Sequence, residues 1–264
     1  MVARWIPLAS AGAAVVLVGV LATAVLAPRI AEVAEDGGAG SAADGGSGNS
    51  EGPRLTFAEQ APPPTRAAEP TGPGVIGLVD PDWVATTAAA TRIPPQAVLA
   101  YAGAVLGAEE VFPGCGLGWN TLAGIGYAES DHGRHGGATF EPNGHVTPKI
   151  FGVPLDGTST AHIPDTDGGQ FDETADIDRA IGPMQLIPQT WASWPSDGNG
   201  DLVPDPHNIY DAAVASANYL CHATTSFVTE DGFRAGVAAY NTADSYLGIV
   251  ATAAQRYLDE TRAR

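Results

Sequence analysis

Residues 119–130 read WNTLAGIGYAES, a Gly- and Ala-rich apolar stretch that carries one acidic side chain, Glu129. Asn120 and Thr121 are residue types that cap helices, so the stretch predicts a helix that begins there and ends near Gly133. Burial on such an apolar helix disfavours the charged form of a carboxylic acid and raises its pKa. A raised pKa keeps part of the acid protonated near neutral pH, as a general acid requires. A surface Glu near a helix end is the alternative, and the stretch alone does not separate the two.

Helical periodicity dominates on both sides of this stretch. Upstream, Pro94-Pro95 open a segment whose apolar residues recur at the spacing of a buried helix face and which stops at Phe112-Pro113-Gly114. Between Gly133 and Arg179 the pattern gives way to Gly, Pro, Thr and Asp with short β-like pieces, which predicts a long insertion with room for a small hairpin. The sequence therefore predicts a mainly α domain with a long loop and a small β insertion. Further helices are expected over about residues 188–194, 208–222, 231–240 and 243–260.

The first third of the chain does not read as globular. Residues 5–27 carry no charge and are mostly Ala, Val and Leu, enough for a helix across a bilayer. A signal peptide cleaved from residues 1–27 is the alternative, and either reading places the rest outside the cytoplasm, in the cell envelope or secreted. Residues 28–74 are rich in Gly, Ala, Ser, Pro and Glu and predict a disordered linker. Folding then falls to residues 75–264, which suffice for one core.

The expected folded part is strongly acidic. Residues 75–264 contain 8 Lys and Arg against 23 Asp and Glu, a formal balance of −15. There is no basic stripe to neutralise phosphates, so nucleic acid is not an expected partner.

The chain has two cysteines, Cys115 and Cys221, both in the part expected outside the cytoplasm. In an oxidising compartment a pair with no third competitor most simply forms one disulfide. The alternative, a catalytic thiol, needs a nearby base and a lowered pKa.

Two further polar motifs follow Glu129-Ser130 along the chain. They are Gly182-Pro183-Met184-Gln185 and Ala239-Tyr240-Asn241, and each lies at the edge of a helix-like segment. Side chains at such edges can project into a shared groove. A single acid with amide and phenol groups, and no obvious nucleophile, suggests cleavage of a glycosidic bond by a general acid/base.

Together the three motifs resemble the signature of lytic transglycosylases with a lysozyme-like (α+β) fold. The flanks tighten the match, because they are similar to the membrane-bound lytic murein transglycosylase B family in its actinobacterial form. The resemblance covers roughly residues 80–258, and its departures are Leu186, where the family commonly has Phe, and the variable insertion at 134–179. The flanks in question are Cys115-Gly116-Leu117-Gly118-Trp119, Ile187-Pro188-Gln189-Thr190-Trp191 and Asp205-Pro206-His207-Asn208-Ile209-Tyr210-Asp211.

The resemblance implies a reaction without water. Glu129 would protonate the oxygen that links N-acetylmuramic acid to N-acetylglucosamine, and would then act as base on the muramyl 6-hydroxyl. That hydroxyl would attack the anomeric carbon and leave a 1,6-anhydro end on the glycan strand. Holding the hydroxyl close makes ring closure intramolecular, and one carboxylate suffices because the substrate supplies its own nucleophile.

The resemblance also implies roles for five further residues that bind substrate. Ser130 would hydrogen-bond near the acid or the substrate N-acetyl group. Gln185 would bind sugar through its amide, with Met184 packing beside it. Tyr240 would orient or protonate the acid, and Asn241 would order the same edge.

Other functions remain open at this point. If Asp131, Asp165 or Asp167 faces Glu129, it could activate a water and make the enzyme a hydrolytic muramidase. A non-catalytic module that binds peptidoglycan in the same groove is a second alternative, and a structural protein of the envelope is a third.

Residues 197–203, DGNGDLV, match the start of a calcium loop, with oxygen ligands at positions 1, 3 and 5 and a backbone carbonyl at 7. The usual Gly at position 6 and Glu at position 12 are missing, so a solvated turn is the alternative. The similar transglycosylases have an ion site in this region. Such an ion would be structural, since the chemistry needs no cofactor. The expected calcium ligands are Asp197, Asn199, Asp201, Val203 and Asp211. The six histidines show no ligand spacing and are expected on the surface.

Overall fold

The computed structural model describes residues 55–158 and 160–263. The apolar segment 5–27 and the first part of the predicted linker lie outside these residues. Among the residues that are described, no helix is both long and apolar enough to cross a membrane.

The described residues form seven α-helices and four short strands, so the prediction of a mainly α domain with a small β part is confirmed. The helices are α1 (Pro81–Thr91), α2 (Pro95–Val111), α3 (Trp119–Ser130), α4 (Pro188–Ser193), α5 (Ile209–Ala223), α6 (Glu230–Tyr240) and α7 (Asp244–Arg262). Two 3-10 turns, η1 (Val75–Leu78) and η2 (His135–Gly137), accompany them. The strands are β1 (Thr139–Phe140), β2 (Val146–Thr147), β3 (Phe151–Pro154) and β4 (Arg179–Ile181).

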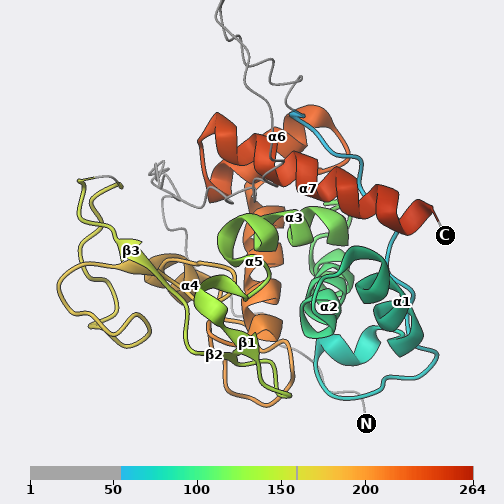
Figure 1. Cartoon of the computed structure of the whole chain (residues 1–264), viewed down its shortest axis with the longest axis horizontal. Coiled ribbons are helices and arrows are strands. Elements are labelled where there is room, and N and C mark those ends of the chain that lie inside the picture. Colours follow the sequence, from blue (N-terminus) through green and yellow to red (C-terminus); the bar gives the residue numbers. More distant parts are fainter. Residues whose placement is uncertain (1–54, 159, 264) are drawn as a thin grey trace, which may run out of the picture.

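The helix that carries Glu129 lies inside the helical part of the molecule, with α7 on one side and the packed pair α2 and α5 on the other (Figure 1). Its glycines allow this close packing. A Cβ at Gly124 would lie 2.8 Å from the carbonyl oxygen of Val250 on α7. One at Gly126 would lie 2.0 Å from the hydroxyl of Tyr101 on α2. The Gly-rich character of residues 119–130 is therefore a packing requirement on two faces of α3.

The segment before η1 differs from the prediction of a disordered linker. Its start packs on the helices, with Ala58 at 0% and Ala61 at 8% exposure. Gln60 Oε1 accepts hydrogen bonds from the Gly118 N–H and the Thr121 hydroxyl, both at 2.8 Å. This glutamine thus caps α3, whose N-cap residue Gly118 has no side chain to do so.

The expected cap residue Asn120 is used differently. It is fully buried, and its side chain accepts from the N–H of Ala61 at 2.8 Å and donates to the carbonyl of Glu59 at 2.9 Å. The incoming chain is therefore bonded to the first turn of α3, and the folded part includes residues 57–61, ahead of the predicted start at residue 75.

The predicted disulfide is confirmed. Cys115 and Cys221 are bonded, with their Cα atoms 5.5 Å apart, across a separation of 106 residues. The bond joins the segment before α3 to the last turn of α5.

The insertion between α3 and α4 forms two small antiparallel sheets beside the helices (Figure 1). Strands β1 and β2 make the short hairpin for which the sequence left room, pairing Thr139 with Thr147. Strands β3 and β4 pair Phe151 with Ile181, and β4 leads directly into the Gly182 motif. The β part thus delivers the second motif to the end of α3.

Candidate active site

Glu129 lies in the last turn of α3, and its side chain is partly buried. Its Oε1 accepts a hydrogen bond of 2.5 Å from the hydroxyl of Tyr246. Tyr246 lies in the first turn of α7 and is only 5% exposed. The structure therefore pairs the predicted acid with one buried phenol.

The surroundings of Glu129 favour its protonated form. Burial raises the pKa of Glu129 to about 7, because it removes water that would solvate the carboxylate. The hydrogen bond from Tyr246 acts in the opposite direction and lowers the pKa. A large fraction of the acid is thus protonated at neutral pH, which matches the expectation for a general acid.

Tyr240 does not make the contact that the sequence predicted for it. Its hydroxyl donates to the carbonyl oxygen of Met184 at 3.0 Å and lies 2.7 Å from the hydroxyl of Ser216 on α5. The phenol bonded to Glu129 is Tyr246, which sequence analysis missed because it fits the apolar stripe of the last helix. Burial, and then the charge of Glu129, raises the pKa of both tyrosines.

Ser130 connects the first motif to the second. It is fully buried, and its hydroxyl donates to the carbonyl of Pro183 at 2.6 Å and accepts from the N–H of Gly133 at 2.7 Å. The Ser130 hydroxyl therefore ties the end of α3 to the second motif, next to the acid, and its contact with substrate stays a prediction.

The second motif forms a tight turn against the helices. Gly182 has a φ of +71°, and a Cβ there would meet the carbonyl oxygen of Pro206 at 2.0 Å. Met184 is fully buried, so of the motif's two predicted binding residues only Gln185 reaches the surface in part. The Gln185 amide donates to the carbonyl of Gly182 at 2.8 Å.

The third motif meets the second through the bond between Tyr240 and the Met184 carbonyl. Asn241 follows at the turn between α6 and α7, is 7% exposed, and accepts from the N–H of Ala243 at 2.9 Å. The fold thus brings all three motifs together around the end of α3, as their order along the chain suggested.

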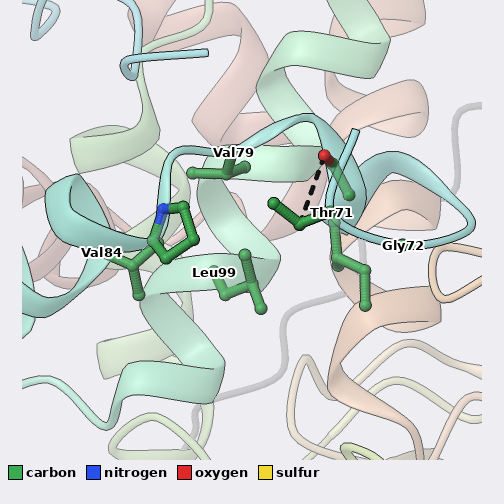
Figure 2. A pocket seen from close by; sticks show the side chains of 8 residues that line it. Thr71, Gly72, Val79, Val84 and Leu99 are labelled. Atoms are coloured by element: carbon green, nitrogen blue, oxygen red, sulfur yellow. Dashed lines mark hydrogen bonds between the residues drawn. The ribbon is translucent and has the colours of Figure 1, made fainter. Parts of the chain in front are cut away.

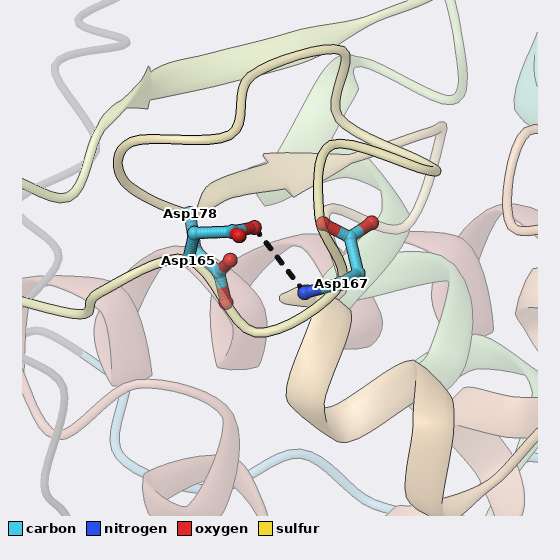
Figure 3. A group of neighbouring side chains, drawn as sticks. All are labelled: Asp165, Asp167 and Asp178. Atoms are coloured by element: carbon cyan, nitrogen blue, oxygen red, sulfur yellow. Dashed lines mark hydrogen bonds between the residues drawn. The ribbon is translucent and has the colours of Figure 1, made fainter.

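The carboxylates considered as partners of Glu129 are engaged elsewhere. Asp131 forms a surface ion pair with Arg134, at 2.7 Å. Asp165 and Asp167 gather with Asp178, which sequence analysis missed, and oxygens of the three lie within 4.8 Å of one another (Figure 3). Carboxylates are ligands for hard cations. Hydrogen bonds from their own loop, such as the one from Thr166 to Asp178 at 2.6 Å, account for this arrangement without an ion.

The predicted calcium ligands bond mainly within their own loop. Asp197 accepts from the N–H of Asp201 at 3.1 Å, and Asp201 accepts from the N–H of Val203 at 2.8 Å and from the Asn199 amide at 3.0 Å. Asp211 is buried, accepts two backbone N–H groups of the loop at 2.8 and 3.0 Å, and has its pKa raised to about 6 by burial. Asp211 therefore closes the loop through the backbone, and calcium binding stays a prediction.

Glu129 lines neither of the following two pockets in the described part of the chain. One pocket, of about 220 Å³, lies between the segment that contains Thr71 and Gly72 and the helices α1 and α2. Val79, Val84 and Leu99 also line it (Figure 2). The other, of about 100 Å³, lies at the turn between α6 and α7 and includes Asn241.

If Glu129 acts as the general acid that the sequence predicts, removing the Tyr246 hydroxyl should slow the reaction that it catalyses. In Tyr246→Phe the carboxyl loses the bond that orients it and that lowers its pKa. We expect a turnover rate about tenfold lower and a pH profile whose alkaline limb moves to higher pH. Tyr219→Phe is the matched control, because that phenol donates to the backbone of Ala239 instead. An unshifted alkaline limb in Tyr246→Phe would contradict the assigned contact.

The raised pKa of Glu129 also predicts a pH-dependent stability. The pKa of about 7 in the folded protein exceeds the ordinary 4.5. The contribution of the Glu129 carboxyl to the free energy of unfolding is therefore complete below pH 4.5 and is lost as the pH rises through 7. Glu129→Gln removes this loss, by at most about 3 kcal/mol, and less to the extent that water reaches the partly buried carboxyl. Thermal unfolding should show the variant more stable than the parent at pH 8, with a smaller gain at pH 5. An equal gain at both pH values would rule out a buried titrating carboxyl.

Searches against protein-family models, curated proteins and solved structures find no match to this chain.

Proposed function

We propose that this protein is a peptidoglycan lytic transglycosylase with a lysozyme-like domain. It would cleave the bond between N-acetylmuramic acid and N-acetylglucosamine without water. The observation that carries the proposal is the Glu129–Tyr246 pair, one carboxyl with its pKa raised to about 7 and one buried phenol, where three motifs meet. The same motifs, in this order, resemble those of lytic transglycosylases.

The proposed chemistry needs one acid. Glu129, protonated, gives its proton to the glycosidic oxygen, and the bond from that oxygen to the anomeric carbon of the muramyl sugar breaks. The resulting carboxylate takes the proton of the muramyl 6-hydroxyl while the oxygen of that hydroxyl bonds to the same anomeric carbon. Glu129 ends protonated again, and no water is consumed. Tyr246 keeps the carboxyl in one orientation through both steps.

The engagement of Asp131 with Arg134 favours this path over hydrolysis. A hydrolase needs a second carboxylate that faces the acid across the sugar ring. A carboxylate in an ion pair of 2.7 Å with the arginine three residues on is poorly placed for that role.

The disulfide supports a location outside the cytoplasm, since such bonds persist in oxidising compartments. Peptidoglycan strands in the cell envelope would be the partner. Residues 5–27 would supply a membrane anchor or a cleaved signal. The balance of −15 over residues 75–264 argues against nucleic acid.

The experiment that tests the proposal is the release of soluble fragments from purified peptidoglycan by the purified protein. We expect release by the parent and none by Glu129→Gln. Binding of the insoluble polymer without release by the parent would instead identify a wall-binding module.

A further inference from the structure

A buried histidine follows Glu129 by three residues. His132 is only 1% exposed, against the expectation that the histidines lie on the surface. Its Nδ1 lies 3.2 Å from the hydroxyl of Tyr101 on α2, and its Nε2 lies 2.7 Å from the hydroxyl of Tyr257 on α7. One ring thus bonds to two other helices, at the point where α3 ends.

The ring is neutral in this setting. Burial lowers the pKa of His132 to about 3, helped by the positive charges of Arg134 and Arg256. A neutral imidazole has one donor and one acceptor, and two hydroxyl groups can satisfy both. The Tyr257 hydroxyl also accepts from Arg256 at 2.8 Å, which fixes its position in turn.

The backbone at this point has a conformation that needs support. Asp131 and His132 have φ values of +51° and +57°, which residues with a Cβ adopt at a cost. This turn lets the His132 N–H reach the carbonyl of Gly126, at 2.9 Å, and so closes α3 after Ser130, the residue that follows Glu129. The side-chain hydrogen bonds of His132 to Tyr101 and Tyr257 also hold this turn in place.

The same helix contacts both Glu129 and His132. Tyr246 and Tyr257 lie eleven residues apart on α7, just over three turns, and therefore on one face. Tyr246 bonds to the acid and Tyr257 bonds to the histidine. Two anchor points therefore fix the end of α3 against α7, and Glu129 belongs to one of them.

We propose that His132 is a positioning residue for Glu129, which acts through Tyr101 and Tyr257 to hold the end of α3 against α7. The reaction it serves rests on the proposed function, whereas the positioning itself does not. Loss of the His132 bonds loosens the turn and admits water to the acid, and loss of burial is the larger of the two influences on the pKa of Glu129. The charged or titratable groups that face His132 are Tyr101, Tyr127, Asp131, Arg134, Arg256 and Tyr257, and those that face Glu129 are Tyr240 and Tyr246.

The test is His132→Phe in the full chain, which keeps a ring in the core but removes both hydrogen bonds. The carboxyl of Glu129 is followed by NMR as the pH is raised, in parent and variant. We expect its pKa to fall toward the ordinary value, since water then solvates the carboxylate. On peptidoglycan we expect a turnover rate about tenfold to a hundredfold lower, with the half-saturating concentration nearly unchanged and the alkaline limb moved to lower pH. His135→Phe, an exposed histidine three residues on, is the matched control.

The outcomes separate this proposal from the proposed function. If the parent releases no fragments, the function fails, while the NMR titration still tests the positioning. An unchanged titration of Glu129 in a folded His132→Phe overturns the positioning role, whatever the activity. Should that variant not fold, Tyr257→Phe removes one of the two bonds and is read in the same way. If His132→Phe and Tyr257→Phe both fold, the double variant should have a turnover rate no lower than that of His132→Phe alone. Additive losses of turnover rate would contradict a shared network.

Discussion

Glu129→Gln is expected to reduce the release of fragments from peptidoglycan by a factor of about 10² to 10⁴. The amide has nearly the same shape but can neither give a proton to the glycosidic oxygen nor take one from the muramyl hydroxyl. Because Glu129 accepts its hydrogen bond from Tyr246 through one oxygen, the Gln side chain can keep that bond through its own carbonyl. The loss should therefore reflect missing proton transfer in an intact fold.

The measurement is the initial rate of release at equal protein concentration, with thermal unfolding of each variant alongside. Glu109→Gln makes the same chemical change at an exposed position on α2 and should leave the rate unchanged. A folded Glu129→Gln with more than a tenth of the parental rate would show that another group transfers the proton.

Removal of the disulfide is expected to have the largest effect on stability. Replacing Cys115 and Cys221 by Ala should lower the free energy of unfolding by about 2 to 5 kcal/mol, because the bond closes a loop of more than a hundred residues. Denaturant unfolding of both forms gives the difference.

Reduction of the parent provides the control for this prediction. Parent protein with its disulfide reduced should have a free energy of unfolding close to that of the double Ala variant. This comparison separates the effect of losing the bond from the effect of losing the buried sulfur atoms. A change below about 1 kcal/mol in both would mean that the unfolded chain gains little freedom when the bond is cut.

The sequence predicted those helices whose apolar spacing and first residues, such as Pro, lie within the helix itself. The apolar spacing of α2 and the Pro that opens it predicted that helix, and similar signals placed α5, α6 and α7. Helix α1 was missed, because its residues are mostly Ala and Thr and give little periodic contrast. Its start was nonetheless marked, since Asp80 caps it and Pro81 is its first residue.

The parts that sequence reasoning got wrong depend on contacts between distant segments. Nothing in the composition of residues 55–61 predicts order, and their burial follows from side chains that reach across about sixty residues, such as Gln60 to Gly118. A fragment that starts at residue 75 would lose this cap on α3. Domain boundaries drawn from composition alone would therefore cut into the core.

The candidate site shows the same division. The first and third motifs lie at helix ends, as the sequence suggested, whereas the second is a turn that follows strand β4. The identity of the phenol was not predicted, since it depends on how α6 and α7 pack against the end of α3, which places Tyr246 and not Tyr240 against Glu129. Burial of His132 was also missed, because it requires Tyr101 and Tyr257 from two other helices.

The most direct test of the central claim is mass spectrometry of the fragments that the protein releases from purified peptidoglycan. Cleavage without water, by one acid and the muramyl hydroxyl, predicts products one water molecule lighter than reducing fragments, and their absence with Glu129→Gln. Fragments with reducing ends would contradict this account, because they require an attacking water and a second carboxylate to activate it.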